Sequence, residues 1–266
     1  MTTNAADERF LSDAARYAAY LETPEGRLRV DLALANLREF LPKAPPPLRV
    51  LDIGCGTGKL GLQLAQLGFH VTLLDVSQRM LDIAGRAAQD TEVADRTLMQ
   101  IGDATGIAAL FDAESFDVIL CHNVLEFVDD PGAVLLSAAR LLRNSSGILS
   151  VLVRNQAGEV LKAALVNGDL VDAEHTMGND WGNESLYGGK VRLFTARTLR
   201  AMLQDASFAI IAERGVRVVS DYLPEKISRA DEYERIFQLE CKLGAAPEFA
   251  AIARYTQCVA RAQARS

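Results

Sequence analysis

The segment from Leu48 to Gly58 constrains the fold more than any other part of this sequence. It reads LRVLDIGCGTG, in which branched aliphatic residues and one acid run into alternating glycines, and a helical apolar pattern begins at Lys59. This order is typical of a buried strand, a tight turn and a helix N-terminus, which together open a βαβ unit. Glycines allow positive φ and close approach of a ligand, and the helix N-terminus offers unpaired N–H groups. We therefore expect a ligand site at this turn.

Three kinds of ligand are compatible with a glycine turn, and the neighbouring residues discriminate among them. A Walker loop is excluded because Ile53 occupies the position of its first glycine and Leu60 that of its Ser or Thr. The stretch Gly56–Gly61 fits G-x-G-x-x-G, but Asp52 at the strand end would repel a pyrophosphate. S-adenosylmethionine carries an ammonium and a sulfonium and no phosphate, so the acid favours it. We predict S-adenosylmethionine as cofactor and S-adenosylhomocysteine as product.

Composition limits the compartment and the partners. The chain has 266 residues, 49% of them hydrophobic, but no apolar run approaches the roughly 18 residues of a membrane helix. The N-terminus lacks the basic and apolar regions of a signal peptide, so we predict a cytoplasmic protein with no membrane partner. The net charge of −7 disfavours a polyanionic partner unless a local basic patch exists. Four scattered cysteines and three histidines lack ligand spacing, so we expect reduced thiols and no metal site.

Strand and helix patterns alternate along most of the chain after the glycine turn. Further strands are predicted over residues 69–75, 97–103, 115–123, 148–153, 208–219 and, returning antiparallel, 255–262. The predicted fold class is α/β, a doubly wound, mostly parallel seven-stranded sheet of Rossmann-like type with N-terminal helices and a lid insertion. Ligands bind beyond the carboxyl ends of the strands in such sheets.

The same patterns predict one domain over residues 1–266, in four parts. Helices from about Phe10 to Phe40, broken by a turn at 23–26, form a cap over residues 1–43. The cofactor-binding core spans 44–154. A segment rich in glycine, with the only Trp of the sequence, forms an insertion or mobile lid over 155–194. Residues 195–266 complete the sheet and include a helical excursion at 221–243.

Several predicted strands end in a polar residue, and each of these residues has two interpretations. Asp75 lies about 20 residues beyond the glycines, where an acid accepts hydrogen bonds from ribose hydroxyls, but it could instead cap the next helix. Asp103 could cap a turn or, as in methyltransferases, meet the adenine amine. His122 could contact the cofactor through its backbone or act as a base for a hydroxyl acceptor. For Cys55, in the glycine turn, we expect a role of the backbone rather than chemistry of the thiol.

Cations also have two interpretations. The stretch Lys190–Arg200 contains four cations and no acid, so it is either a solvated face or a patch that receives an anionic substrate. Spacing alone favours a solvated helix position for Arg29.

Four stretches together resemble the tRNA carboxymethoxyuridine methyltransferases, a class I family that esterifies the carboxylate of a modified wobble uridine. These stretches are Thr23–Arg29, the glycine turn, Cys121–Glu126 and Gly215–Lys226. The resemblance assigns Arg29 to the cofactor, against the spacing argument. The resulting cofactor set is Arg29, Asp52, Gly54, Cys55, Gly56, Asp75, Val76, Met80, Asp103, Ala104 and His122.

The acceptor is less constrained. The sequence departs from the family in the nearly uncharged stretch 177–184, where a lysine run is expected, and in Arg154, where an aromatic residue is expected. A carboxylate acceptor is ionised near pH 7 and needs no general base, and guanidinium groups would hold it. The candidates for acceptor binding are Arg154, Arg192, Arg197, Arg217 and Tyr222. The expected partner is tRNA or an anionic small molecule.

Two alternatives stay open at this point. One is an O- or N-methyltransferase of a free metabolite or natural product, favoured by the acidic pI and the Gly/Trp-containing lid. The other is a non-catalytic S-adenosylmethionine-binding protein.

Overall fold

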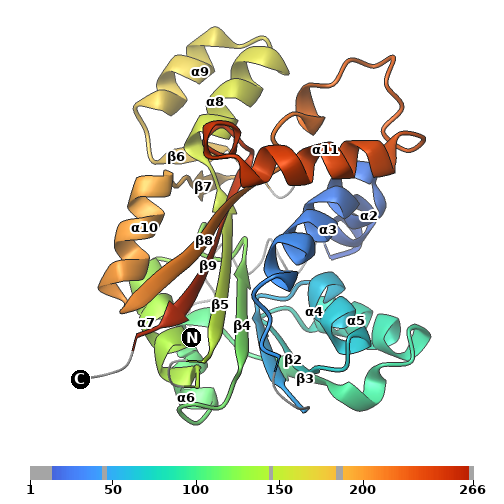
Figure 1. The fold of residues 1–266 in the computed structure, drawn as a ribbon, viewed down its shortest axis with the longest axis vertical. Coiled ribbons are helices and arrows are strands. Elements are labelled where there is room, and N and C mark those ends of the chain that lie inside the picture. The colour runs from blue at the N-terminus through green and yellow to red at the C-terminus, as the bar shows by residue number, and fades with distance from the viewer. Residues whose placement is uncertain (1–13, 44–46, 144–145, 184–187, 264–266) are drawn as a thin grey trace.

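The computed structural model describes residues 14–43, 47–143, 146–183 and 188–263. Within them a seven-stranded sheet has the order β3-β2-β1-β4-β5-β9-β8 (Figure 1). Neighbours from β3 to β5 are parallel, whereas β9 runs antiparallel to β5 and β8. The strands are β1 Arg49–Ile53, β2 His70–Asp75, β3 Thr97–Ile101, β4 Val118–His122, β5 Ile148–Arg154, β8 Phe208–Val216 and β9 Tyr255–Ala262. The predicted mostly parallel, doubly wound fold is confirmed.

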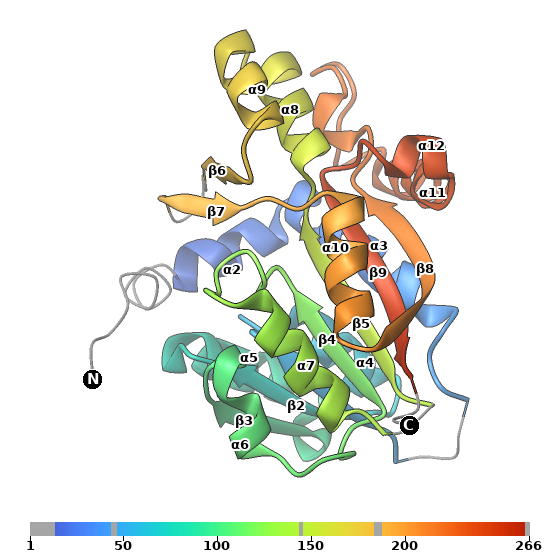
Figure 2. The same ribbon diagram turned by 90° about the vertical axis from the view of Figure 1, so that its left-hand side faces the viewer.

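Helices cover both faces of this sheet, as the near-continuous apolar strands require. One face carries α3 Pro24–Arg38, α4 Lys59–Gln66 and α5 Gln78–Asp90, and the other carries α6 Ile107–Leu110, α7 Pro131–Leu141 and α10 Ala196–Asp205 (Figures 1 and 2). In β1, Leu51 and Ile53 pack against the face covered by α6, α7 and α10, whereas Val50 packs against the face covered by α3, α4 and α5. Successive side chains of a strand point to opposite faces of the sheet, which explains this alternation.

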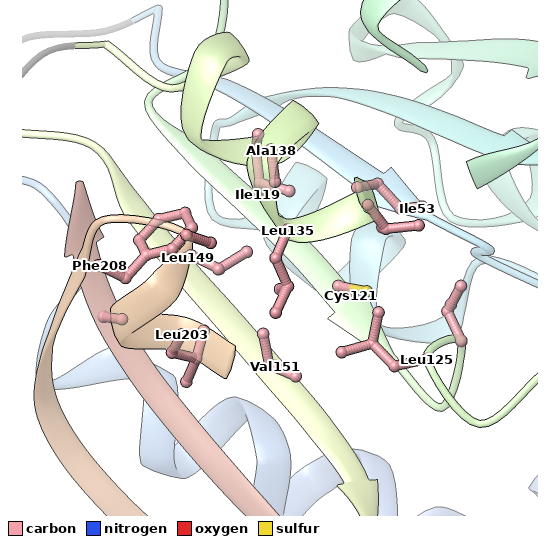
Figure 3. Packing of buried hydrophobic residues seen from close by; sticks show 14 of the residues in the cluster. Ile53, Ile119, Cys121, Leu125, Leu135, Ala138, Leu149, Val151, Leu203 and Phe208 are labelled. Atoms are coloured by element: carbon pink, nitrogen blue, oxygen red, sulfur yellow. The ribbon is translucent and has the colours of Figure 1, made fainter. Parts of the chain in front are cut away.

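The core between the sheet and α7 is closely packed. Figure 3 shows Leu135 of α7 and Leu203 of α10 near Val151 of β5, and both leucines are fully buried. Truncating such a side chain to alanine destabilises a core by about 2–5 kcal/mol. This packing fixes the strand ends that carry polar residues.

The N-terminal helices have the predicted break. Helix α2 spans Ala14–Glu22, and α3 begins at Pro24 because the side chain of Thr23 accepts a hydrogen bond from the Gly26 N–H. Proline at the first helical position and an Ncap threonine are a favoured start. The expected start near Phe10 lies outside the described residues, as do residues 44–46.

The insertion is more regular than its glycines suggest. Helices α8 Gln156–Leu165 and α9 Leu170–Met177 are followed by a hairpin of β6 Trp181–Asn183 and β7 Lys190–Arg192. Asn155 and Asp169 cap the two helices. The pair α8–α9 lies beyond the carboxyl end of β5, at the top of Figures 1 and 2. Its motion as a lid stays a prediction.

The segment between β8 and β9 differs from the expected bounds. β8 ends at Val216 rather than near Val219, and α11 Tyr233–Ala245 starts later than residue 221, after the turn η3 Ser220–Tyr222. The cause is Glu240, only 1% exposed, whose carboxylate accepts from the N–H groups of residues 218, 219 and 220 at 2.6–2.9 Å. A short helix α12, Pro247–Ala250, then leads into β9.

None of the helices in the described ranges is long and apolar enough to cross a membrane.

Candidate functional site

Three adjoining cavities lie where β1, β2, β4 and β5 end, and all three share Gly54 and Asn123. Their volumes are about 410, 50 and 220 Å3. Every residue of the predicted cofactor set lines one of them. The largest cavity is lined by Arg29, Gly54, Gly56, Asp75, Met80 and His122 of this set. Asp52 and Cys55 line the smallest cavity, and Val76, Asp103 and Ala104 line the third.

The glycine turn forms a tight cradle. Gly54, Gly56 and Gly58 have φ of 61°, 54° and 74°. A Cβ on Gly54 would lie 2.5 Å from Cγ2 of Val124, so only glycine fits without displacement. Asp75 supports the turn, because its carboxylate accepts from the Gly56 N–H at 2.8 Å and from the Ser77 N–H at 2.9 Å.

Buried acid is concentrated beside this turn. Asp52 is 5% exposed, and burial together with the charge of Asp75 raises its pKa to about 7, against a backbone hydrogen bond from Gly61. Burial likewise raises the pKa of Asp75. In the described part of the chain no Lys or Arg forms a salt bridge with either carboxylate. The cradle therefore fits a nucleoside that brings positive charge, as S-adenosylmethionine does, and fits a pyrophosphate poorly.

Asp103 shows the capping geometry that was one of its two interpretations. Its Oδ1 accepts from the N–H and the hydroxyl of Thr105, each at 2.7 Å. The residue also lines the third cavity, so capping and ligand contact are compatible here.

Arg29 is not on a solvated helix face, and that interpretation was wrong. The side chain is buried because α3 packs on the sheet, and the residue is only 7% exposed. Its guanidinium donates to Asn123 Oδ1 at 3.1 Å and to the Tyr17 hydroxyl at 2.9 Å. Arg29 thus enters the largest cavity as a fixed cation, where the resemblance placed it.

His122 is poorly suited to act as a base. Its Nε2 lies 2.8 Å from Ser150 Oγ. Burial and the nearby Arg29 charge lower its pKa to about 3. An imidazole with so low a pKa is a weak proton acceptor near pH 7, which favours the alternative of a cofactor contact.

Part of the lining of the largest cavity is rich in cations. This basic wall carries Arg154, Lys162, Arg217 and Arg254, and Asp221 lines the cavity beside them. Arg154 Nη1 lies 3.2 Å from Glu159 Oε1, and Arg254 lies 2.9 Å from Glu159 and 3.0 Å from Asp221. Arg217 also pairs with Asp221.

Tyr255 lies among these guanidinium groups. Burial alone would raise the pKa of its hydroxyl, but the charges of Arg154, Arg29, Arg217 and Arg254 lower it to about 8. The wall therefore favours negative charge even on a buried phenol.

The structure brings together only part of the predicted acceptor set. Arg154 and Arg217 lie on the cavity wall, but Arg192 lies over the ring of Trp181 at 5.2 Å, and Arg197 is exposed on α10. The Tyr222 hydroxyl donates to the Gly158 carbonyl at 3.3 Å, and Tyr222 is not part of the cavity lining.

Sequence reasoning missed Arg254, Tyr255, Asn123 and Lys162. Arg254 and Tyr255 enter the site because β9 pairs antiparallel with β5, which sets Tyr255 opposite Arg154. The sequence did predict an antiparallel last strand, which would place its residues beside β5. The pairing register that sets Tyr255 opposite Arg154 depends on the preceding turn and could not be predicted from the sequence.

Comparison with known proteins identifies the family. The methyltransferase-domain family matches residues 25–213. The chain is 32% identical over 247 residues, 90% of each chain, to the tRNA 5-carboxymethoxyuridine methyltransferase of Escherichia coli. It is 37% identical over 144 residues to the ubiquinone biosynthesis O-methyltransferase of Caulobacter vibrioides, covering 52% of this chain and 54% of that one.

A solved structure shares the fold. The CcbJ methyltransferase from Streptomyces caelestis superimposes with a TM-score of 0.65 at 18% identity, over 98% of this chain and all of that one. Fold, cradle and sequence matches agree, and the chain belongs to the S-adenosylmethionine-dependent methyltransferases of class I.

Proposed function

We propose that this enzyme methylates the carboxylate of 5-carboxymethoxyuridine in tRNA, and that it does so in the cytoplasm. The observation that carries the proposal is that Arg154, Arg217 and Arg254 line the same cavity as the glycine turn and Asp75. The relative that is 32% identical over 90% of this chain acts, by its name, on this nucleoside.

We assign the predicted cofactor residues to S-adenosylmethionine, which supplies a methyl group on a positively charged sulfur. The chain's own residues hold the acceptor. A carboxylate between guanidinium groups stays ionised and is oriented by forked hydrogen bonds, so no general base is required. Orientation of this kind can supply up to roughly 7–11 kcal/mol. The backbone of Arg154 is held by Glu126, whose carboxylate accepts a hydrogen bond from the Arg154 backbone N–H at 2.9 Å.

Binding of an RNA requires local cations, because the net charge is −7. Lys190 and Arg197 are exposed on β7 and on α10 and could meet phosphates outside the cavity. Few such contacts predict a weak salt dependence of affinity.

The test is methyl transfer from labelled S-adenosylmethionine to tRNA that carries unesterified carboxymethoxyuridine. Digestion to nucleosides should show a labelled methyl ester, which mild alkali releases as methanol. The control is tRNA without the modification, which should take up no label. Absence of labelled ester on the modified tRNA, with cofactor bound, would refute the acceptor assignment.

A second candidate is methylation of a free small molecule. Its support is the partial relative that acts in ubiquinone biosynthesis and the acidic net charge. A metabolite extract assayed in parallel separates the two, since this candidate predicts label in an extractable small molecule. Cofactor binding without product from either source would instead favour a non-catalytic role.

A further inference from the structure

A line of buried polar side chains leads from α3 to His122 behind the cavity. Gln257 of β9 is fully buried. Its Oε1 accepts from Asn36 Nδ2 at 3.0 Å, and its Nε2 donates to the Ala33 carbonyl and to Ser150 Oγ, each at 3.0 Å. Ser150 Oγ in turn lies 2.8 Å from His122 Nε2.

The donors and acceptors available to these groups favour one direction for each hydrogen bond. A carbonyl can only accept, so the Ala33 contact identifies the nitrogen of the Gln257 amide. Ser150 Oγ therefore receives a hydrogen from Gln257. Its second lone pair could also accept from His122, but its own hydrogen would then have no acceptor among the described residues, so this hydrogen is assigned to His122 Nε2. Nε2 then presents its lone pair, and a neutral imidazole carries its one hydrogen on Nδ1.

We propose that Gln257 and Ser150 act as positioning residues that hold His122 as the Nδ1–H tautomer, so that it offers a neutral N–H to a carboxylate in the cavity beside Arg29. His122 and Arg29 line the two cavities that meet at Gly54. The opposite tautomer would direct a lone pair at the same carboxylate and repel it. The proposal depends on the methyltransferase family and does not require a particular acceptor.

Two observations support a donor role. In the described residues no side chain or carbonyl accepts a hydrogen bond from Nδ1 of His122, which leaves this group for a ligand. Burial and the charge of Arg29 lower the pKa of His122 to about 3, so the ring stays neutral at physiological pH and the tautomer is well defined. The carboxylate can come from the methionine part of the cofactor or from the acceptor.

The first test is direct and needs no variant. The sequence has three histidines, so 15N-labelled protein gives a simple imidazole spectrum in which each tautomer has its own chemical-shift pattern. We expect the ligand-free wild type to show His122 with hydrogen on Nδ1, unchanged across neutral pH. An Nε2–H pattern would overturn the proposal whatever the enzyme's acceptor.

The second test removes the positioning group. Gln257→Met keeps the size of the side chain but removes both donors, so Ser150 can either donate or accept and His122 should populate both tautomers. The adjacent Thr256→Val, on the other face of β9, is the matched control and should keep the wild-type spectrum. A single Nδ1–H tautomer persisting in Gln257→Met would refute the role of Gln257.

Binding measurements then identify the carboxylate. By calorimetry without acceptor, Gln257→Met should weaken S-adenosylhomocysteine about 3- to 10-fold, the range for one lost hydrogen bond, and leave 5′-methylthioadenosine unchanged because it lacks the carboxylate. If S-adenosylhomocysteine is unaffected while the acceptor KM rises, the acceptor supplies the carboxylate. If neither changes in a variant whose tautomer has changed, the proposed carboxylate contact is wrong.

Discussion

The site has two regions of opposite electrostatic character, an acidic end at the glycine turn and a basic end at the basic wall. At the glycine turn, Asp52 and Asp75 are buried without a basic partner among the described residues, and their carboxyl pKa values are raised. At the basic wall, Arg154, Arg217 and Arg254 gather around Tyr255, and the pKa of the phenol is lowered. One end is built to receive positive charge and the other to receive negative charge.

This difference would let neighbouring cavities bind two ligands of opposite charge, each at its own end. Burying charges of the same sign close together is unfavourable. Each end is therefore stabilised most by a bound ligand of the opposite charge. A sulfonium would be favoured beside the carboxylates of the acidic end, and an anionic acceptor beside the arginines of the basic end. The arrangement would bring the two reacting groups together without a proton-transfer residue between them.

The largest expected effect concerns Asp52 in the ligand-free enzyme. Its folded pKa is about 7 and its ordinary value 3.8, so the folded state holds a proton that the unfolded state releases as pH rises. The free energy of unfolding should therefore fall between about pH 4 and pH 7 and then level off. The loss is about 4 kcal/mol at about 1.4 kcal/mol per pKa unit.

Urea unfolding of Asp52→Asn against pH measures this effect, since the variant should lack that part of the pH dependence. Asp103→Asn is the matched control at an exposed strand-end acid and should follow the wild type. Parallel pH profiles for wild type and Asp52→Asn would show that the acidic end carries no electrostatic strain.

The next effect is steric and affects the acidic end alone. Gly54→Ala places a Cβ 2.5 Å from Val124 Cγ2 at a φ of 61°. The free variant should relax its turn to escape backbone strain of about 1–2 kcal/mol and overpacking of about 1–3 kcal/mol. Binding must restore the strained turn at a cost of about 3 kcal/mol, so affinity for S-adenosylhomocysteine should fall about 100-fold. Gly85→Ala in α5, where a Cβ meets open space, should bind normally. Equal affinities would mean that the turn does not contact the cofactor.

The acidic end could be predicted from sequence because it is local. Strand, turn and acid follow one another within residues 48–75, and a parallel sheet places all such strand ends at one edge. The basic wall is assembled from the end of β5, the turn held by Glu240 and the start of β9. No local pattern reveals that Arg154, Arg217 and Arg254 converge, since the register of an antiparallel strand and a buried capping acid bring them together.

The arginines separate the two ends most clearly in kinetics. Arg154→Ala removes a charge-assisted donor from the basic wall, and kcat/KM for the acceptor should fall about 30- to 100-fold, or about 2–3 kcal/mol. Affinity for S-adenosylhomocysteine should change less than about threefold, because the acidic end is intact. Arg197→Ala, an exposed arginine of α10, is the matched control and should leave kcat/KM for a small nucleoside acceptor unchanged. Unaltered turnover in Arg154→Ala would remove this residue from the acceptor site.

The smallest effect reports on the potential at the basic end itself. Tyr255 should ionise near pH 8, because four arginine charges outweigh the burial that opposes its ionisation. The sequence has six tyrosines, so the ionisation of Tyr255 is measured as the difference between the ultraviolet titration curves of the wild type and Tyr255→Phe. In Arg154→Ala the midpoint should rise by about one unit, equivalent to about 1.4 kcal/mol, while Arg197→Ala should leave it in place. If Tyr255 instead ionised near pH 10, as an ordinary tyrosine does, the carboxylates of Glu159 and Asp221 would neutralise the arginines of the wall completely. The contrast between the two ends would then depend on the buried acids alone.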